Sequence, residues 1–182
     1  MDNTIDQIAI GELLDGRYFY IPAYQRGYRW TEKQVGDLLK DLLSFIYDRE
    51  DDTGKRKGND FYCLQPVITR PITDKAKIAK LFGEELASSV IEHGAWEVID
   101  GQQRFTTLFL VYRYLLEKIG ISKEDLKDED REEYHILYET RDGSTAFLEH
   151  LDKSFLEDVV DESAYSTNID FYHMGKAFRY ID

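Results

Sequence analysis

Two short segments of this chain combine arginine, glutamine and aromatic residues in a pattern that suits anion binding. Between Tyr24 and Trp30 there are two arginines, three aromatic residues and a glutamine. The second segment, Asp100–Thr107, reads DGQQRFTT and holds a carboxylate, a glycine, two carboxamides, an arginine and two hydroxyls. A guanidinium group binds two phosphate oxygens at once, and aromatic rings stack on planar bases. We therefore expect these segments to bind a phosphorylated ligand.

Both segments are predicted to lie between a strand and a helix. Residues 18–21 form a short apolar run that ends at Pro22, and a helix is predicted from Glu32 to Tyr47 after a capping box of Thr31 and Gln34. Residues 96–99 form a second strand, and a helix with a period of three to four apolar residues follows over residues 105–119. A helix N-terminus presents unpaired N–H groups and the positive end of the helix dipole, so phosphates bind there.

The same residues also allow structural interpretations. Asp100 with Gln103 is itself a capping box, Gly101 suits a turn with positive φ, and Arg104 suits a solvated first helical turn. The aromatic residues of the first segment would equally cover the edge of a core. The P-loop pattern G-x-x-x-x-G-K-[ST] is absent from the sequence.

The remaining pattern predicts an α+β fold, with a small mixed β-sheet surrounded by helices and a helical C-terminal part. Its other expected helices cover residues 5–14 and 75–92, resume after Ser144 and begin again at the N-cap residue Asn168. Strands are expected at residues 61–69, where Pro66 suggests a sheet edge, and at residues 134–140. Residues 1–182 are expected to form a single domain, with an acidic helical subregion over about residues 120–182.

Charge and composition restrict the class of protein. The net charge is −13, and residues 117–162 contain 16 acidic and six basic residues, a net of −10. This balance argues against a general DNA-binding surface, which needs arrays of basic side chains. The single cysteine, Cys63, excludes an internal disulfide and lies in an apolar run that predicts a core position. No signal peptide or membrane-spanning run is present in the sequence, so we expect a cytoplasmic protein without a membrane partner.

Two motifs give the chain a resemblance to a known family. I-P-x-Y-Q-R-x-Y-x-W at residues 21–30 and D-G-Q-Q-R-[FL]-T-T-L at residues 100–108 resemble the N-terminal domain of GmrSD-type restriction endonucleases, with Phe105 where leucine is more usual. Residues 168–174 resemble a weaker family segment. This prokaryotic family is related to the ParB/sulfiredoxin-like fold. The resemblance implies a domain that binds and hydrolyses a nucleoside triphosphate (NTP) with Mg²⁺, coupled to a C-terminal HNH-type nuclease domain in antiviral restriction.

The resemblance also implies roles for the matched residues. Arg104 would be the main phosphate ligand, and Asp100 would position Mg²⁺ or a water, with Asp100 or Gln103 as the candidate group that activates water. The other residues expected to contact the nucleotide lie in the same two motifs: Gln25, Arg26, Tyr28, Trp30, Gly101, Gln102 and Thr106.

No HNH signature occurs in the sequence, so we expect an N-terminal fragment of a longer protein that meets DNA only through a missing nuclease domain. A homodimer is a further expectation. Two alternatives stay open: a ParB-like domain that binds or cuts DNA directly, and a non-catalytic interaction module in which the DGQQR element is structural.

Overall fold

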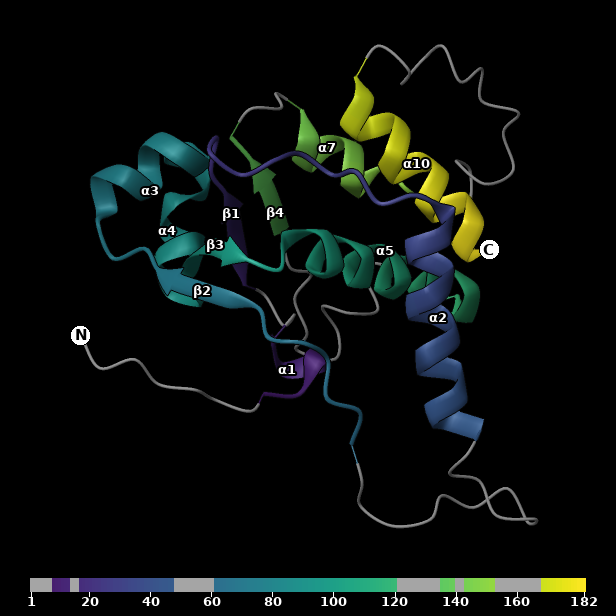
Figure 1. The fold of residues 1–182 in the computed structure, drawn as a ribbon. Helices are drawn as coiled ribbons and strands as arrows, with labels where there is room; N and C mark the ends of the chain where they lie inside the picture. The colour runs from purple at the N-terminus through teal and green to yellow at the C-terminus, as the bar shows by residue number, and fades with distance from the viewer. Residues whose placement is uncertain (1–7, 14–16, 48–60, 121–134, 140–142, 153–167) are drawn as a thin grey trace.

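A four-stranded mixed sheet lies at the centre of the molecule (Figure 1). The structure is a computed structural model that describes residues 8–13, 17–47, 61–120, 135–139, 143–152 and 168–182. The strand order is β2-β3-β1-β4, and β1 (Tyr18–Ile21) runs parallel to both β3 (Ala95–Asp100) and β4 (His135–Tyr138). β2 (Ile68–Pro71) pairs antiparallel with the outer side of β3. The mixed sheet expected from the sequence is confirmed.

Helices pack on both faces of this sheet (Figure 1). On one face lie α3 (Lys75–Phe82) and α4 (Glu84–His93). The other face is covered by α5 (Gln102–Ile119), around which α2 (Glu32–Tyr47), α7 (Ser144–Glu149) and α10 (Ile169–Ile181) assemble, while the short α1 (Ile10–Leu13) packs at the margin of the same core. The expected α+β class with a helical C-terminal part is therefore confirmed.

The central strand β1 is buried on both faces, because helices cover the sheet from both sides. Successive side chains of a strand point to opposite faces. Phe19 and Ile21 accordingly pack with Phe105 in the α5 core, whereas Tyr18 and Tyr20 pack toward α3 and α4. A strand buried in this way reads as a continuous apolar run, as Tyr18–Ile21 does.

The three parallel strands end at one edge of the sheet, and both motif segments begin there. The amide of Glu139, directly after β4, donates to the carbonyl of Ile21 over 3.0 Å. Its carboxylate accepts from the amide of Ala23 over 2.6 Å, which fixes the start of the first segment. Open sheets with parallel strands commonly bind ligands at the carboxyl ends of those strands.

Several element boundaries differ from the sequence prediction. Residues 61–67 are not a strand, and β2 begins only at Ile68, beyond Pro66. Cys63 lies in this irregular stretch and is exposed, so the predicted core position was wrong. Gly83, with φ 86°, divides the predicted helix 75–92 into α3 and α4. α5 begins at Gln102, three residues earlier than predicted.

Other predicted elements agree with the structure where it describes them. Asn168 caps α10 by accepting from the amide of Asp170 over 3.0 Å, as predicted. The amide of Thr31 donates to the Gln34 side chain over 2.8 Å, which is one half of the predicted capping box, and the Thr31 hydroxyl donates to the same oxygen. The first helix begins at Ile10, after residues 8 and 9, and the part of its predicted range at residues 5–7 and 14 lies outside the described residues. Much of the acidic subregion, residues 121–134 and 153–167, also lies outside them. Among the helices of the described part, none combines the length and the apolar character needed to cross a bilayer.

Candidate functional site

The DGQQR segment forms a sharp turn from β3 into α5. Gly101 adopts the left-handed conformation with φ 87° and ψ 9°, which favours glycine. A Cβ atom there would also lie 3.2 Å from the carbonyl oxygen of Pro66 and 3.3 Å from Val67. Within the described residues, no side chain caps the helix at this position. The first N–H groups of α5 therefore remain available to an anion.

The predicted alternative of an Asp100–Gln103 capping box is wrong. The Asp100 carboxylate instead accepts from the amide of the next residue, Gly101, over 2.8 Å. The Gln103 side chain turns away from the start of the helix and contacts the first motif. Its Oε1 accepts from the amide of Arg29 over 2.7 Å, and its Nε2 donates to the carbonyl of Gly27 over 2.8 Å.

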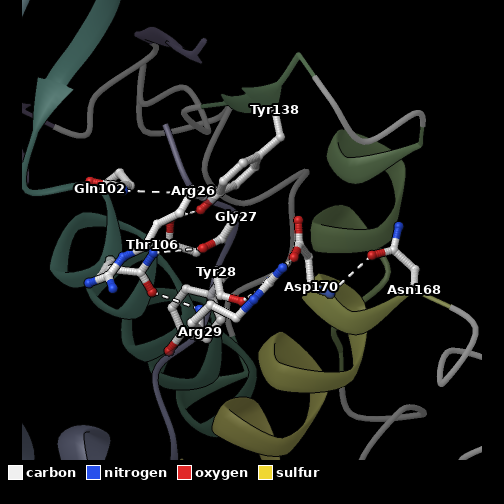
Figure 2. A network of polar contacts seen from close by, with 10 residues as sticks. Arg26, Gly27, Tyr28, Arg29, Gln102, Thr106, Tyr138, Asn168 and Asp170 are labelled. Atoms are coloured by element: carbon white, nitrogen blue, oxygen red, sulfur yellow. Dashed lines mark hydrogen bonds and ion pairs between the residues drawn. The ribbon is translucent and has the colours of Figure 1, made fainter. Parts of the chain in front are cut away.

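Two further glutamine contacts hold the motifs side by side. Gln102 donates from Nε2 to the carbonyl of Arg26 over 3.4 Å (Figure 2). In the reverse direction, Gln25 donates from its side chain to the carbonyl of Ile99 over 2.5 Å. Residues some 75 positions apart in the sequence thus form one surface, as the paired motifs suggested.

Several predicted contact residues form the support beneath this surface. The Tyr28 hydroxyl is buried and shares a hydrogen bond of 2.8 Å with Thr107, and the buried Thr106 shares one of 2.7 Å with the Tyr138 hydroxyl (Figure 2). Burial raises the pKa of both tyrosines well above the ordinary range, so both hydroxyls remain protonated. Trp30 is half-buried and packs against the α5 core. These side chains pack on the core side of residues 24–30 and so support the shape of that loop.

A half-buried ion pair joins the first motif to the C-terminal helix. The Arg29 guanidinium contacts the carboxylate of Asp170, which is fully buried in the first turn of α10 (Figure 2). Gly27 lies directly against the same carboxylate, and a Cβ atom there would approach Asp170 Oδ2 to 2.1 Å. This pairing was not predicted from the sequence, since only the weak resemblance over residues 168–174 pointed to this region.

Three charged residues of the predicted site reach solvent at the surface. Arg26 and Asp100 are exposed, and Arg104 is half-exposed and donates to the side-chain oxygen of Gln65. A short polar side chain such as Gln65 leaves the remaining N–H groups of a guanidinium able to bind an anion. The cationic and anionic groups of the site are therefore the ones that solvent can reach.

The residues present fit a magnesium ion only if a ligand completes its coordination. Among the described residues, no group of three histidine, cysteine or acidic side chains lies together. Mg²⁺ often binds through one or two carboxylates, with waters and substrate phosphates as its other ligands. The exposed carboxylate of Asp100, at the N-terminus of α5, meets that requirement for one ligand.

A buried glutamate that the sequence analysis did not select lies beside the site. Glu97 in β3 is 3% exposed and accepts hydrogen bonds from Tyr24, Arg70 and Lys77. Burial alone would raise the pKa of this carboxyl, but the hydrogen bonds from Arg70, Tyr24 and Lys77 outweigh burial and lower it. A charged residue within the strand run W-E-V-I-D was the available signal. A separate apolar hollow of about 280 Å³ lies between β2, β3, α3 and α4, and Glu97, Arg70 and Lys77 are not among its lining residues.

Comparison with known proteins places the chain in a family. A family model described as "GmrSD restriction endonuclease, N-terminal domain" matches residues 10–180, nearly the whole chain. No curated protein and no solved structure matches.

Proposed function

Because this chain belongs to the family of GmrSD restriction endonuclease N-terminal domains, we propose that it binds nucleoside triphosphates and hydrolyses them with Mg²⁺. One observation carries the proposal. The uncapped N-terminus of α5, with Arg104 in its first turn, lies next to the Arg26 loop. The side chains of Gln102 and Gln103 hydrogen-bond directly to the backbone of that loop. Such an arrangement combines N–H groups, a helix dipole and two guanidinium groups, each of which favours the binding of phosphate.

In this proposal the phosphates lie at the Gly101–Gln102 turn. The first N–H groups of α5 donate to phosphate oxygens, and Arg104 binds them from the helix side. Arg26 binds them from the opposing loop, and Gln102 fixes the backbone of this loop by a hydrogen bond to the Arg26 carbonyl. Fixed donors of this kind stabilise charge that develops during phosphoryl transfer without needing to reorganise.

Asp100 and Gln103 have different roles. The exposed Asp100 would hold Mg²⁺, which supplies charge neutralisation and orients the phosphates when bound. Gln103 acts as a positioning residue, because both of its polar atoms already hold the first motif. Tyr28 and Thr106 support the site from the core rather than contact the nucleotide.

The family description names a restriction endonuclease, and we propose that this domain controls a DNA-cutting domain in a prokaryotic defence protein. Direct DNA cleavage or binding by this chain is the rival function, and its net charge of −13 disfavours contact with a duplex. A non-catalytic module is the second rival, and it predicts no effect of nucleotides.

Thermal unfolding with ATP, GTP, CTP and UTP, each with Mg²⁺, tests the proposal. A nucleotide at a hundred times its dissociation constant stabilises the fold by about 2.7 kcal/mol, which raises Tm by about 5–10 °C in a domain of this size. The Arg104→Ala variant should lose the shift. Arg17→Ala is the matched control, because Arg17 stacks on Trp96 near the opposite end of the strands and should leave the shift intact. The absence of a shift with all four nucleotides would favour the non-catalytic module.

A further inference from the structure

Tyr24 combines an exposed ring with an anchored hydroxyl. Its side chain is 65% exposed, yet the hydroxyl donates to Glu97 Oε1 over 3.0 Å. A surface tyrosine without such a partner samples several rotamers, and a partner restricts it at a cost in entropy. The ring of Tyr24 is therefore held in place while its face remains accessible to solvent.

The anchor for this hydroxyl is itself well fixed. Both carboxylate oxygens of Glu97 lie 2.9 Å from Nη2 of Arg70, and Oε2 lies 3.2 Å from Nζ of Lys77. A buried carboxylate is stable only when cations and hydrogen-bond donors compensate its charge. Arg70 comes from β2 and Lys77 from α3, so two separate elements fix the position of Glu97 in β3.

The turn that carries Tyr24 is attached to the proposed phosphate site. The amide of Gln25 donates to the carbonyl of Pro22 over 2.9 Å, which closes a tight turn. The side chain of Gln25 then contacts the carbonyl of Ile99, one residue before Asp100. At about 3.3 Å per strand residue, Glu97 lies about 10 Å along β3 from Asp100. The sugar and phosphates of a nucleotide can extend over such a separation.

We propose that Tyr24 is the platform on which the base of the nucleotide stacks, with Glu97 as the residue that positions its ring. This inference rests on the proposed nucleotide function, and it assigns the base-binding part of the same site. Stacking of one base on an aromatic ring strengthens binding by about 5- to 150-fold. Because every base has a flat face, the platform would accept several nucleotides.

Calorimetric titration with the four nucleotides and with inorganic tripolyphosphate, all with Mg²⁺, tests this inference. The wild-type chain should bind nucleotides more tightly than tripolyphosphate. Tyr24→Ala should weaken nucleotide binding at least fivefold and leave tripolyphosphate binding unchanged, whereas Tyr24→Phe, which keeps the ring, should retain more of the affinity than Tyr24→Ala. Tyr180→Ala is the control, since Tyr180 is a 47% exposed tyrosine on α10.

The other outcomes separate the two claims. One outcome is that the wild-type chain binds nucleotides, that Arg104→Ala abolishes this binding and that Tyr24→Ala does not change it. This outcome would refute the base platform and leave the proposed function standing. Equal weakening of nucleotides and tripolyphosphate in Tyr24→Ala would show that Tyr24 only holds the loop, which also refutes the platform. If the wild-type chain binds neither nucleotides nor tripolyphosphate, both claims are wrong.

Discussion

Gln103 connects the two motifs, and removing its side chain measures how strongly they are held together. In Gln103→Ala the amide of Arg29 and the carbonyl of Gly27 each lose their partner. A buried polar group left without a hydrogen bond costs about 1–3 kcal/mol. The shorter side chain also loses buried methylene contacts, at about 0.8 kcal/mol per group. Partial access of water to the loop reduces the sum, so we expect a loss of about 2–4 kcal/mol in unfolding free energy.

Chemical denaturation gives this free energy, and thermal unfolding should show a fall in Tm of about 5–15 °C for a domain of this size. Gln102→Ala is the matched control, because Gln102 is an equally buried neighbour with a single hydrogen bond of 3.4 Å. Hydrogen exchange adds a local measurement, since the Arg29 amide should lose protection only in Gln103→Ala. The reasoning is refuted if Gln103→Ala is no less stable than Gln102→Ala, or if the Arg29 amide keeps its protection.

Two further predictions concern the surroundings of the site. Gly27→Ala should destabilise the fold by about 1–3 kcal/mol or more in urea denaturation, because its Cβ would lie 2.1 Å from Asp170. Gly120→Ala is the control, because Gly120 has the left-handed conformation with φ 77° and ψ 26° and its Cβ would meet no described atom within 4 Å. It should lose only the roughly 1 kcal/mol of its positive φ, and equal losses in the two variants would exclude the steric explanation. The pKa of Glu97 is lowered in the folded chain. The ionised carboxylate therefore contributes its full stabilisation at a pH above 4.5, the ordinary pKa of a glutamate, and this stabilisation is lost as the pH falls through the lower pKa of the folded state. Glu97→Gln should therefore be less stable than wild type at pH 7, with a difference that shrinks in acid, and a difference independent of pH would contradict this.

The sequence predicted the parts of the site that depend on local pattern. The strand-to-helix junctions follow from an apolar run, a turn residue and a helical period, and these signals lie within a few residues of one another. The Asn168 cap and the Thr31–Gln34 pair were predicted for the same reason, and the structure confirms both.

Contacts across the fold left no comparable signal. Arg29 and Asp170 are 141 residues apart, and no local pattern specifies their pairing. Polar residue types were also misleading about burial. Thr106 and Tyr28 suggested ligand contacts, but both side chains are buried, and their hydroxyls bond to Tyr138 and Thr107 inside the core. Cys63 gave the opposite error, because residues 61–67 form no strand and the cysteine side chain is exposed.

The ion pair between Arg29 and Asp170 has a consequence for the order of folding. The first motif is complete only when segments from the beginning, middle and end of the domain have met, since Gln103 and Asp170 both hold it. Contacts between distant residues form late, because closing long loops costs entropy before the contacts compensate for it. On the ribosome, the loop of Arg26 would therefore reach its final shape only after α10 has emerged. The surface that we propose binds the nucleotide is then among the last parts of the domain to form.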